Sequence, residues 1–181
     1  MMPGPLPRGH RTEELVPPAK PVEQLKFQSL SEFACVSLLE KYTPWKAVQR
    51  FTFQVDIGRT SFDFLIFNTL VEYHPISLRR EMQSNALSKI MSAVHRLNRG
   101  LKVQVLDGLR EELESQYVRR RRQVASAHPV YKELEVVCAF SPESFISLVI
   151  KRFANRPLPK DETLAAEFRQ FQKRGRSHLQ K

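Results

Sequence analysis

The sequence predicts an α/β fold, a mixed sheet flanked by helices in the order α-β-β-β-α-α-β-α. Residues 48–57 alternate between apolar and polar side chains, as a half-buried strand does. Residues 62–74 contain two apolar runs around a tight turn, and residues 78–97 carry apolar side chains at helical spacing. With 41% hydrophobic residues in a chain of 181, one core can be built, so we expect a single domain with tails.

The first elements have recognisable start and stop signals. Ser29 with Glu32 three residues later matches a capping box, which predicts a helix from this point to about Tyr42. The alternating segment that follows is the first strand, and the Gly and Ser of residues 58–61 predict the turn that ends it. The hairpin comes next, and Pro75 ends its second strand because proline has no N–H to donate.

The second half of the predicted domain is mainly helical. The predicted elements are a helix over residues 78–97 closed by Gly100 as C-cap, a long helix over residues 109–127, a strand over residues 135–140, and a last helix that starts at Ser141 and Pro142 and runs to about Ala154. Residues 101–108 fit either a short strand or a connector.

Both ends of the chain differ in composition from the middle. Residues 1–28 hold half of the twelve prolines and show no apolar periodicity, which predicts a flexible arm. Residues 156–181 are rich in Lys and Arg and predict a flexible basic tail, within which residues 162–171 could form a short helix. The predicted domain is therefore residues 29–155.

The composition also bears on the compartment. The first residues lack the apolar core of a signal peptide, and no run approaches the roughly eighteen apolar residues of a membrane-spanning helix. Cys35 and Cys138 lie far apart in apolar segments, which predicts two buried thiols rather than a disulfide or a metal knuckle. We therefore expect a cytoplasmic protein in a reducing environment, with no membrane segment.

The charge of the chain favours a polyanionic partner. The net charge is +10 with a pI near 9.9, and the central part stays basic without its tails, which suits nucleic acid. The residues that we expect to contact phosphate are Arg119, Arg120, Arg121 and Arg122, with Arg79, Arg80 and Lys89 on the preceding helix. No P-loop, dinucleotide glycine motif, nucleophile elbow or zinc spacing is present.

The predicted hairpin places two carboxylates face to face. If its turn is centred between Phe67 and Asn68, Asp63 and Glu72 are directly opposed, with Cβ atoms about 4.5–5.5 Å apart. Two negative charges among apolar neighbours need a compensating positive charge, and hard divalent cations take oxygen ligands. The pattern therefore indicates a metal site. A turn shifted by one residue would instead make them ordinary solvent-facing carboxylates on different faces.

These residues resemble the PD-(D/E)XK nuclease superfamily, which has the restriction-endonuclease-like fold. The resemblance consists of a Glu in an opening helix, a hairpin that carries Asp and then Glu-x-Lys, a helix, and a later strand–helix pair. It covers about residues 29–155. The matching positions are Glu32, Asp63 and Glu72, while His74 stands where the family usually has lysine.

The resemblance implies a metal-dependent nuclease that hydrolyses phosphodiester bonds, with DNA as the first candidate substrate. Asp63 and Glu72 would bind Mg²⁺ or Mn²⁺, with a backbone carbonyl near Tyr73 and Glu32 completing the shell. The metal would activate a water and stabilise charge on the scissile phosphate. These roles make Asp63, Glu72, Glu32 and His74 the expected catalytic residues.

His74 is the departure from the family pattern. It lies two residues after Glu72, so it shares the same strand face and can hydrogen-bond a water or touch the metal. Its unperturbed pKa near 6.5 makes it a weaker cation than lysine at neutral pH. Gln83 or Lys89 of the following helix could supply the missing group.

The same residues also fit other classes of protein. One alternative is a non-catalytic nucleic-acid-binding or assembly protein on the same fold, with its site degraded at His74. Another is an interaction module whose basic surface meets an acidic protein partner, and a homodimer also stays open. Each residue has a structural explanation too: Glu32 as a capping residue, His74 as a strand-end surface residue, and the arginines as a solvated face paired with Glu111, Glu112 and Glu114.

Overall fold

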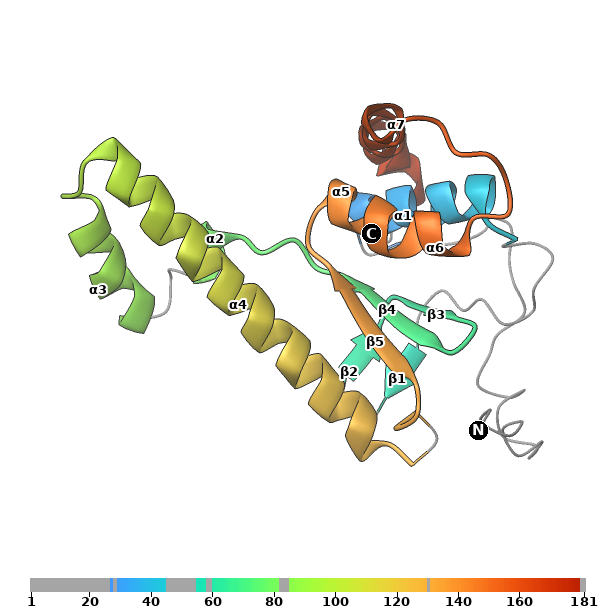
Figure 1. Cartoon of the computed structure of the whole chain (residues 1–181), viewed down its shortest axis with the longest axis horizontal. Helices are drawn as coiled ribbons and strands as arrows, with labels where there is room; N and C mark the ends of the chain where they lie inside the picture. The colour runs from blue at the N-terminus through green and yellow to red at the C-terminus, as the bar shows by residue number, and fades with distance from the viewer. Residues whose placement is uncertain are drawn as a thin grey trace.

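The protein has a mixed α/β architecture in which helices surround a small three-stranded sheet (Figure 1). The structure, a computed structural model, describes residues 27, 29–44, 55–57, 60–81, 85–129 and 131–179. The strands are β1 (Val55–Ile57), β2 (Thr60–Phe62), β3 (Phe64–Ile66), β4 (Thr69–Tyr73) and β5 (Glu135–Ala139). The helices are α1 (Leu30–Tyr42), α2 (Leu78–Glu81), α3 (Asn85–Val94), α4 (Arg99–Ala127), α5 (Pro142–Phe145), a π-helical segment (Ile146–Ile150), α6 (Lys151–Phe153), α7 (Asp161–Arg174) and a 3₁₀ turn (Gly175–His178).

The sheet has the strand order β3-β4-β5 and mixes two kinds of pairing. β3 and β4 are antiparallel, with Phe64 opposite Val71, whereas β4 and β5 are parallel, with Glu72 opposite Cys138. β1 and β2 form a separate antiparallel pair. β4 is therefore the central strand, and Glu72 lies one residue beyond its pairing with β3 and opposite Cys138 of β5.

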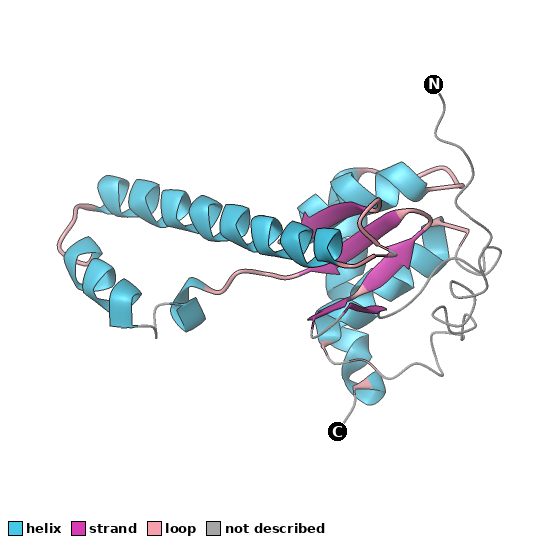
Figure 2. Cartoon of the chain, turned by 90° about the horizontal axis from the view of Figure 1, so that it is seen from below, coloured by secondary structure: helices cyan, strands magenta, loops and turns pink. Residues whose placement is uncertain are grey.

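Helices cover both faces of this sheet (Figures 1 and 2). Side chains of β3 and β4 alternate between the faces, as the strand period requires. Phe64 and Val71 pack in the larger core with α1, α5 and α7, and Leu65 and Leu70 pack in a smaller core under α4. Glu72 follows Val71, so it shares the α4 face with Leu70.

The prediction for the first helix is confirmed. Ser29 has extended backbone angles, and its hydroxyl accepts a hydrogen bond from the backbone N–H of Glu32 at 3.1 Å. The helix ends at Tyr42, where the N–H and the hydroxyl of Thr43 both donate to the carbonyl of Leu39. Because α1 lies against β4 and α7, its first turn is placed close to the hairpin.

The hairpin turn occupies Phe67 and Asn68, as predicted. Phe67 has a φ of 53°, in the left-handed region that aromatic residues seldom adopt. Its ring lies 5.8 Å from the ring of Phe153 on α6. This tight reversal fixes the pairing of Leu65 with Leu70 and thereby the register of the whole hairpin.

The connection between β4 and β5 differs from the prediction. The helix predicted over residues 78–97 is described as α2 and α3 and ends at Val94, and residues 101–108 are helical rather than strand or connector. Gly100 does not close a helix but lies in the first turn of α4, whose N-cap is Asn98, with Oδ1 accepting from the N–H of Leu101 at 3.0 Å. A glycine costs a helix only about 1 kcal/mol relative to alanine, so a 29-residue helix can contain it.

The predicted flexible basic tail is wrong for residues 161–174. They form α7, which packs against α1, and its Leu164, Ala165 and Phe168 are buried in the larger core. Gly175 ends α7 so close to α1 that an added Cβ would lie 2.9 Å from the Phe33 ring. The domain therefore extends beyond residue 155.

The remaining predictions have mixed outcomes. The last predicted helix does begin at Ser141 with Pro142 at its first position, and Ser144 completes a capping box. Of the predicted strand over residues 48–57, residues 55–57 form β1 and residues 48–54 lie outside the described part. Thr60 and Ser61 belong to β2 rather than to a turn.

The ends and the cysteines complete the comparison. Of the predicted N-terminal arm, only Phe27 is described, and it is buried and bridges to Leu179. Cys35 and Cys138 are free buried thiols, as predicted, and burial together with the charge of Glu72 raises the pKa of Cys138 to about 12. Within the described segments, no helix is long and apolar enough to cross a membrane.

Candidate active site

The hairpin brings Asp63 and Glu72 to opposed positions. β3 and β4 pair Phe64 with Val71, and one further step of the same register pairs Asp63 with Glu72. Asp63 lies in the bend before β3, and its Oδ2 accepts a hydrogen bond from the backbone N–H of Tyr73 at 2.7 Å. The register predicted from the sequence is therefore confirmed, and the charge of Glu72 acts on Asp63.

Negative charge accumulates around Asp63. Burial raises the pKa of Asp63 well above its ordinary value, and the charges of Glu72 and Glu32 raise it further. The N–H of Tyr73 and the guanidinium of Arg121 act in the opposite direction. Glu32 is itself buried, in the first turn of α1. The structure thus brings three of the predicted site carboxylates into electrostatic range, an arrangement that favours binding of a cation.

Glu72 is held from one side by two residues of α4. It is only 5% exposed, and its Oε1 accepts a hydrogen bond from the Tyr117 hydroxyl at 2.6 Å. The same oxygen accepts from Nη2 of Arg121 at 2.6 Å. Tyr117 and Arg121 are four residues apart, so both project from the same face of α4. The helix therefore contributes a buried ion pair to the central strand.

Arg121 is anchored by more than this ion pair. Its Nη1 donates to the carbonyl of Ser61 at 2.8 Å, and its Nε donates to the Tyr117 hydroxyl at 2.9 Å. Its guanidinium carbon lies 5.0 Å from the centre of the Tyr117 ring and 5.3 Å from that of Phe62. The sequence placed Arg121 in a row of phosphate contacts and did not indicate Tyr117. Their four-residue spacing was the available signal, but it does not show which helix face meets β4.

The second oxygen of Glu72 differs from the first in its surroundings. Its Oε2 is buried and has no hydrogen-bond partner in the part that the structure describes. Leaving such a group unpaired costs about 1–3 kcal/mol, so this oxygen together with Asp63 fits a divalent cation. Mg²⁺ is often held by one or two carboxylates with water completing its shell.

Asp63 and Glu72 are a pair and not part of a larger metal-binding cluster in the described part of the chain. Among the described residues, no group of three or more His, Cys, Asp or Glu side chains is arranged to hold an ion. A cation at this position would therefore have Asp63 and Glu72 as its described side-chain ligands, with the charge of Glu32 acting on Asp63.

His74 lies beside this pair but does not replace a lysine. Its backbone N–H donates to the carbonyl of Ala139 at 2.9 Å. Its ring is stacked on Tyr117, with ring centres 4.2 Å apart and planes 8° from parallel. Burial lowers the pKa of His74, and the charge of Glu72 opposes this only in part. The imidazole is therefore neutral at pH 7 and supplies no fixed positive charge.

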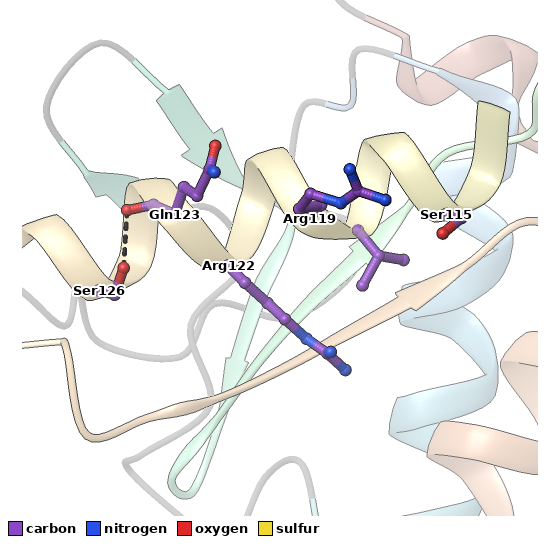
Figure 3. A pocket seen from close by; sticks show the side chains of 6 residues that line it. Ser115, Arg119, Arg122, Gln123 and Ser126 are labelled. Atoms are coloured by element: carbon purple, nitrogen blue, oxygen red, sulfur yellow. Dashed lines mark hydrogen bonds between the residues drawn. The ribbon is translucent and has the colours of Figure 1, made fainter. Parts of the chain in front are cut away.

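A pocket is lined by side chains of α4 (Figure 3). Its volume is about 540 Å³, and it is lined by Ser115, Val118, Arg119, Arg122, Gln123 and Ser126. Arg119 and Arg122 are exposed and lie about one helical turn apart. Two guanidinium groups beside hydroxyl and amide groups can bind phosphate oxygens by charge-assisted hydrogen bonds.

The other cations predicted to contact nucleic acid are spread over the molecule. Arg120 is exposed on α4, and Arg80 is exposed on α2. Lys89 is exposed on α3, which lies at the end of α4 that is distant from the sheet (Figure 1). Arg79 lies in α2, but its side chain is outside the described part, as is Gln83. Lys89 is therefore not placed to serve the carboxylates.

Comparison with family models, with curated proteins and with solved structures found no match for the chain.

Proposed function

We propose that this chain is a metal-dependent nuclease that hydrolyses phosphodiester bonds, with DNA as the first candidate substrate, on a restriction-endonuclease-like fold. The observation that carries the proposal is the opposition of Asp63 and Glu72 at the base of the hairpin, with Glu72 Oε2 buried and unpaired in the described part of the chain. Buried polar atoms with a purely structural role are nearly always hydrogen-bonded by the chain or by water. An unpaired carboxylate oxygen beside a second carboxylate supports a cation-binding role.

The arrangement of elements around the hairpin supports the same proposal. α1 carries Glu32 toward the site, the antiparallel hairpin carries Asp63 and Glu72, and β5 returns parallel to β4 before α5 begins. A Glu in an opening helix, a hairpin that carries Asp and Glu, and a later strand–helix pair are the features on which the resemblance to PD-(D/E)XK nucleases depends, and they support the proposal.

Each residue of the site has a role in this proposal. Asp63 and Oε2 of Glu72 hold Mg²⁺ or Mn²⁺, and the N–H of Tyr73 orients the Asp63 carboxylate through its Oδ2. The ion, when bound, activates a water and stabilises charge on the scissile phosphate. Tyr117 and Arg121 orient Glu72 through Oε1. Because Glu72 is almost fully buried, its charge is poorly screened by solvent.

The substrate class follows from charge. The chain carries a net charge of +10, and the pocket of α4 presents Arg119 and Arg122, on the helix whose Tyr117 and Arg121 bond to Glu72. Contacts to the phosphate backbone are independent of sequence and weaken steeply with salt. Arg80 on α2 and Arg120 on α4 are also exposed and add positive charge elsewhere on the surface. Nucleic acid is therefore the polyanion that we propose as substrate.

One observation favours a second candidate, a non-catalytic nucleic-acid-binding or assembly protein. The Arg121 guanidinium already neutralises Glu72 at 2.6 Å, and His74 provides no lysine-like charge. In such a protein the ion pair would be the end state of a site that no longer uses metal.

The experiment that tests the proposal compares wild type with Asp63→Asn. Labelled single-stranded, duplex and branched DNA and RNA are incubated with each protein in Mg²⁺, Mn²⁺ or EDTA. We expect metal-dependent cleavage by wild type and loss of at least about 100-fold in the variant. Asn keeps an oxygen that can accept from Tyr73, so the fold should be retained. Arg169→Ala, a change on the exposed side of α7, is the control for preparation.

The outcomes separate the two candidates. Equal cleavage by wild type and Asp63→Asn would show that the activity comes from elsewhere. Binding without cleavage of any substrate in either metal would favour the non-catalytic protein. Cleavage that requires Asp63 and metal would support the nuclease.

A further inference from the structure

The site lacks a lysine on its strand, yet a positive charge reaches it from α4. We propose that Arg121 is the fixed cation of the site and takes the place of the lysine expected at His74. This inference rests on the proposed metal-dependent function. It assigns to Arg121 a role different from the exposed arginines of the same helix.

The first argument is that Arg121 is held in one place. Its side chain is only 17% exposed. It donates to Glu72, to the Tyr117 hydroxyl and to the carbonyl of Ser61, and it lies against the rings of Tyr117 and Phe62. The guanidinium is thus bonded to β2, to β4 and to its own helix, which fixes its position in the site. Its neighbours Arg119, Arg120 and Arg122 are exposed.

The second argument is how Glu72 divides its two oxygens. Oε1 accepts from both Tyr117 and Arg121, while Oε2 has no partner within the described part of the chain. Arg121 therefore does not occupy the oxygen that a metal ion would use. The ion pair and a cation beside Asp63 can exist together, which distinguishes this arrangement from a site that is simply blocked.

The third argument is that no other described residue is placed to supply this charge. The His74 ring is stacked on the Tyr117 ring, with ring centres 4.2 Å apart, and it is not a lysine that carries a permanent charge. Lys89 lies on α3 at the distal end of α4 (Figure 1). Among the described residues near the carboxylates, Arg121 is the basic side chain that is paired with Glu72 and also acts on Asp63.

A fixed cation and a structural brace make different predictions. A guanidinium beside the carboxylates repels a divalent metal ion and attracts a phosphate. Its removal should therefore strengthen the binding of metal and weaken the binding of phosphate. A brace that only holds α4 against β4 would affect both ligands in the same direction, because its loss would loosen the site. The sign of the two changes therefore separates the roles.

The first measurement is Mn²⁺ affinity by isothermal titration calorimetry, without nucleic acid. We expect Arg121→Met, which keeps the length of the side chain, to bind Mn²⁺ about tenfold more tightly than wild type. Arg121→Lys should bind as wild type does, because it keeps the charge. Arg119→Met, a change of the same kind on the exposed face of α4, is the matched control and should also leave Mn²⁺ affinity unchanged. Asp63→Asn should abolish binding in every background.

The second measurement is the affinity for a nuclease-resistant phosphorothioate duplex at saturating Mn²⁺, by fluorescence anisotropy. We expect Arg121→Met to bind this duplex about tenfold more weakly. Adding His74→Lys should restore duplex binding and return Mn²⁺ affinity to the wild-type value, because it provides the charge from β4. This double variant also serves if Arg121→Met alone does not fold.

Three results would overturn the inference. If Arg121→Met weakens both Mn²⁺ and duplex binding and His74→Lys does not restore them, Arg121 is only a brace. If Mn²⁺ affinity is unchanged, its charge does not act on the metal site. If wild type itself shows no Mn²⁺ binding that depends on Asp63, the proposed function fails, and the inference fails with it.

Discussion

The Tyr117 hydroxyl connects Glu72 to Arg121. It donates to Oε1 of Glu72 at 2.6 Å and accepts from Nη2 of Arg121 at 2.6 Å. The central strand and the long helix are thus joined by a hydrogen-bonded chain as well as by the apolar contacts of the smaller core. Burial and the bond to Glu72 both raise the pKa of Tyr117, so the hydroxyl stays protonated and remains a donor across the physiological range.

Tyr117→Phe is expected to lower the free energy of unfolding by roughly 1–3 kcal/mol. The change removes a donor from buried Glu72 but keeps the ring that stacks on His74. Urea unfolding followed by circular dichroism measures the effect. Tyr131→Phe is the matched control, because Tyr131 is buried but no hydrogen bond of its hydroxyl is seen in the described part. Equal stability of Tyr117→Phe and wild type would show that this bond is not a stabilising link.

Asp63→Asn is expected to stabilise the metal-free protein, and more so as the pH rises. The pKa of Asp63 is raised in the folded state, so folding takes up a proton between its ordinary value near 3.9 and the raised value. Wild-type stability therefore falls with rising pH across this interval, by about 1.4 kcal/mol for each pH unit that the interval spans. The variant lacks this loss, because it cannot ionise.

Unfolding free energies of both proteins in EDTA, at several pH values from about 4 to 8, measure this difference. The difference should be small near the acidic end, should grow with pH and should then level off. A difference that is constant with pH would mean that neither burial nor neighbouring negative charge raises the pKa of Asp63. Saturating Mg²⁺ should reverse the order of stability at the alkaline end, because only the wild type gains a bound ion.

Phe168→Ala is expected to lower the free energy of unfolding by about 3–5 kcal/mol. Phe168 is fully buried, and its ring centre lies 5.4 Å from that of Tyr73 on the central strand. Arg169→Ala, one residue further on the exposed side of α7, should change stability by no more than about 0.5 kcal/mol. Thermal and urea unfolding measure both. A negligible effect of Phe168→Ala would mean that residues 161–174 do not pack in the core and belong to a flexible tail.

The sequence could predict what depends on local pattern. The register of Asp63 with Glu72 follows from a two-residue period and from the position of the turn at Asn68. The sequence could therefore predict which residues of the hairpin lie opposite each other. The start of α1 at Ser29 could be predicted for the same reason, because a cap is a local interaction. The mixed α/β class follows from the sum of such local elements.

Long-range packing accounts for what the sequence could not predict. α7 has an ordinary amphipathic pattern and follows a Pro-rich, basic stretch in the sequence. Phe168 becomes a core residue only because α7 packs on α1. Arg121 is one of four consecutive arginines, and nothing local distinguishes it from Arg119 or Arg122. Its inward position depends on which face of α4 meets β4, and that is a tertiary fact.

The exposed Arg119 and Arg122 of α4 should contact nucleic acid through their charge alone. If Arg119 and Arg122 each contact a phosphate of duplex DNA, replacing both with Ala should reduce the slope of log K against log salt concentration by about 2. Arg169→Ala, whose exposed guanidinium lies on α7 and pairs with Glu143, should leave the slope unchanged.

Fluorescence anisotropy with a phosphorothioate duplex, from about 50 to 200 mM salt, measures all three proteins. The effect should be equal for duplexes of unrelated sequence, because phosphate contacts carry no base information. An unchanged slope in the double variant would move the binding surface away from the pocket of α4, and sequence-dependent losses would show that these side chains read bases.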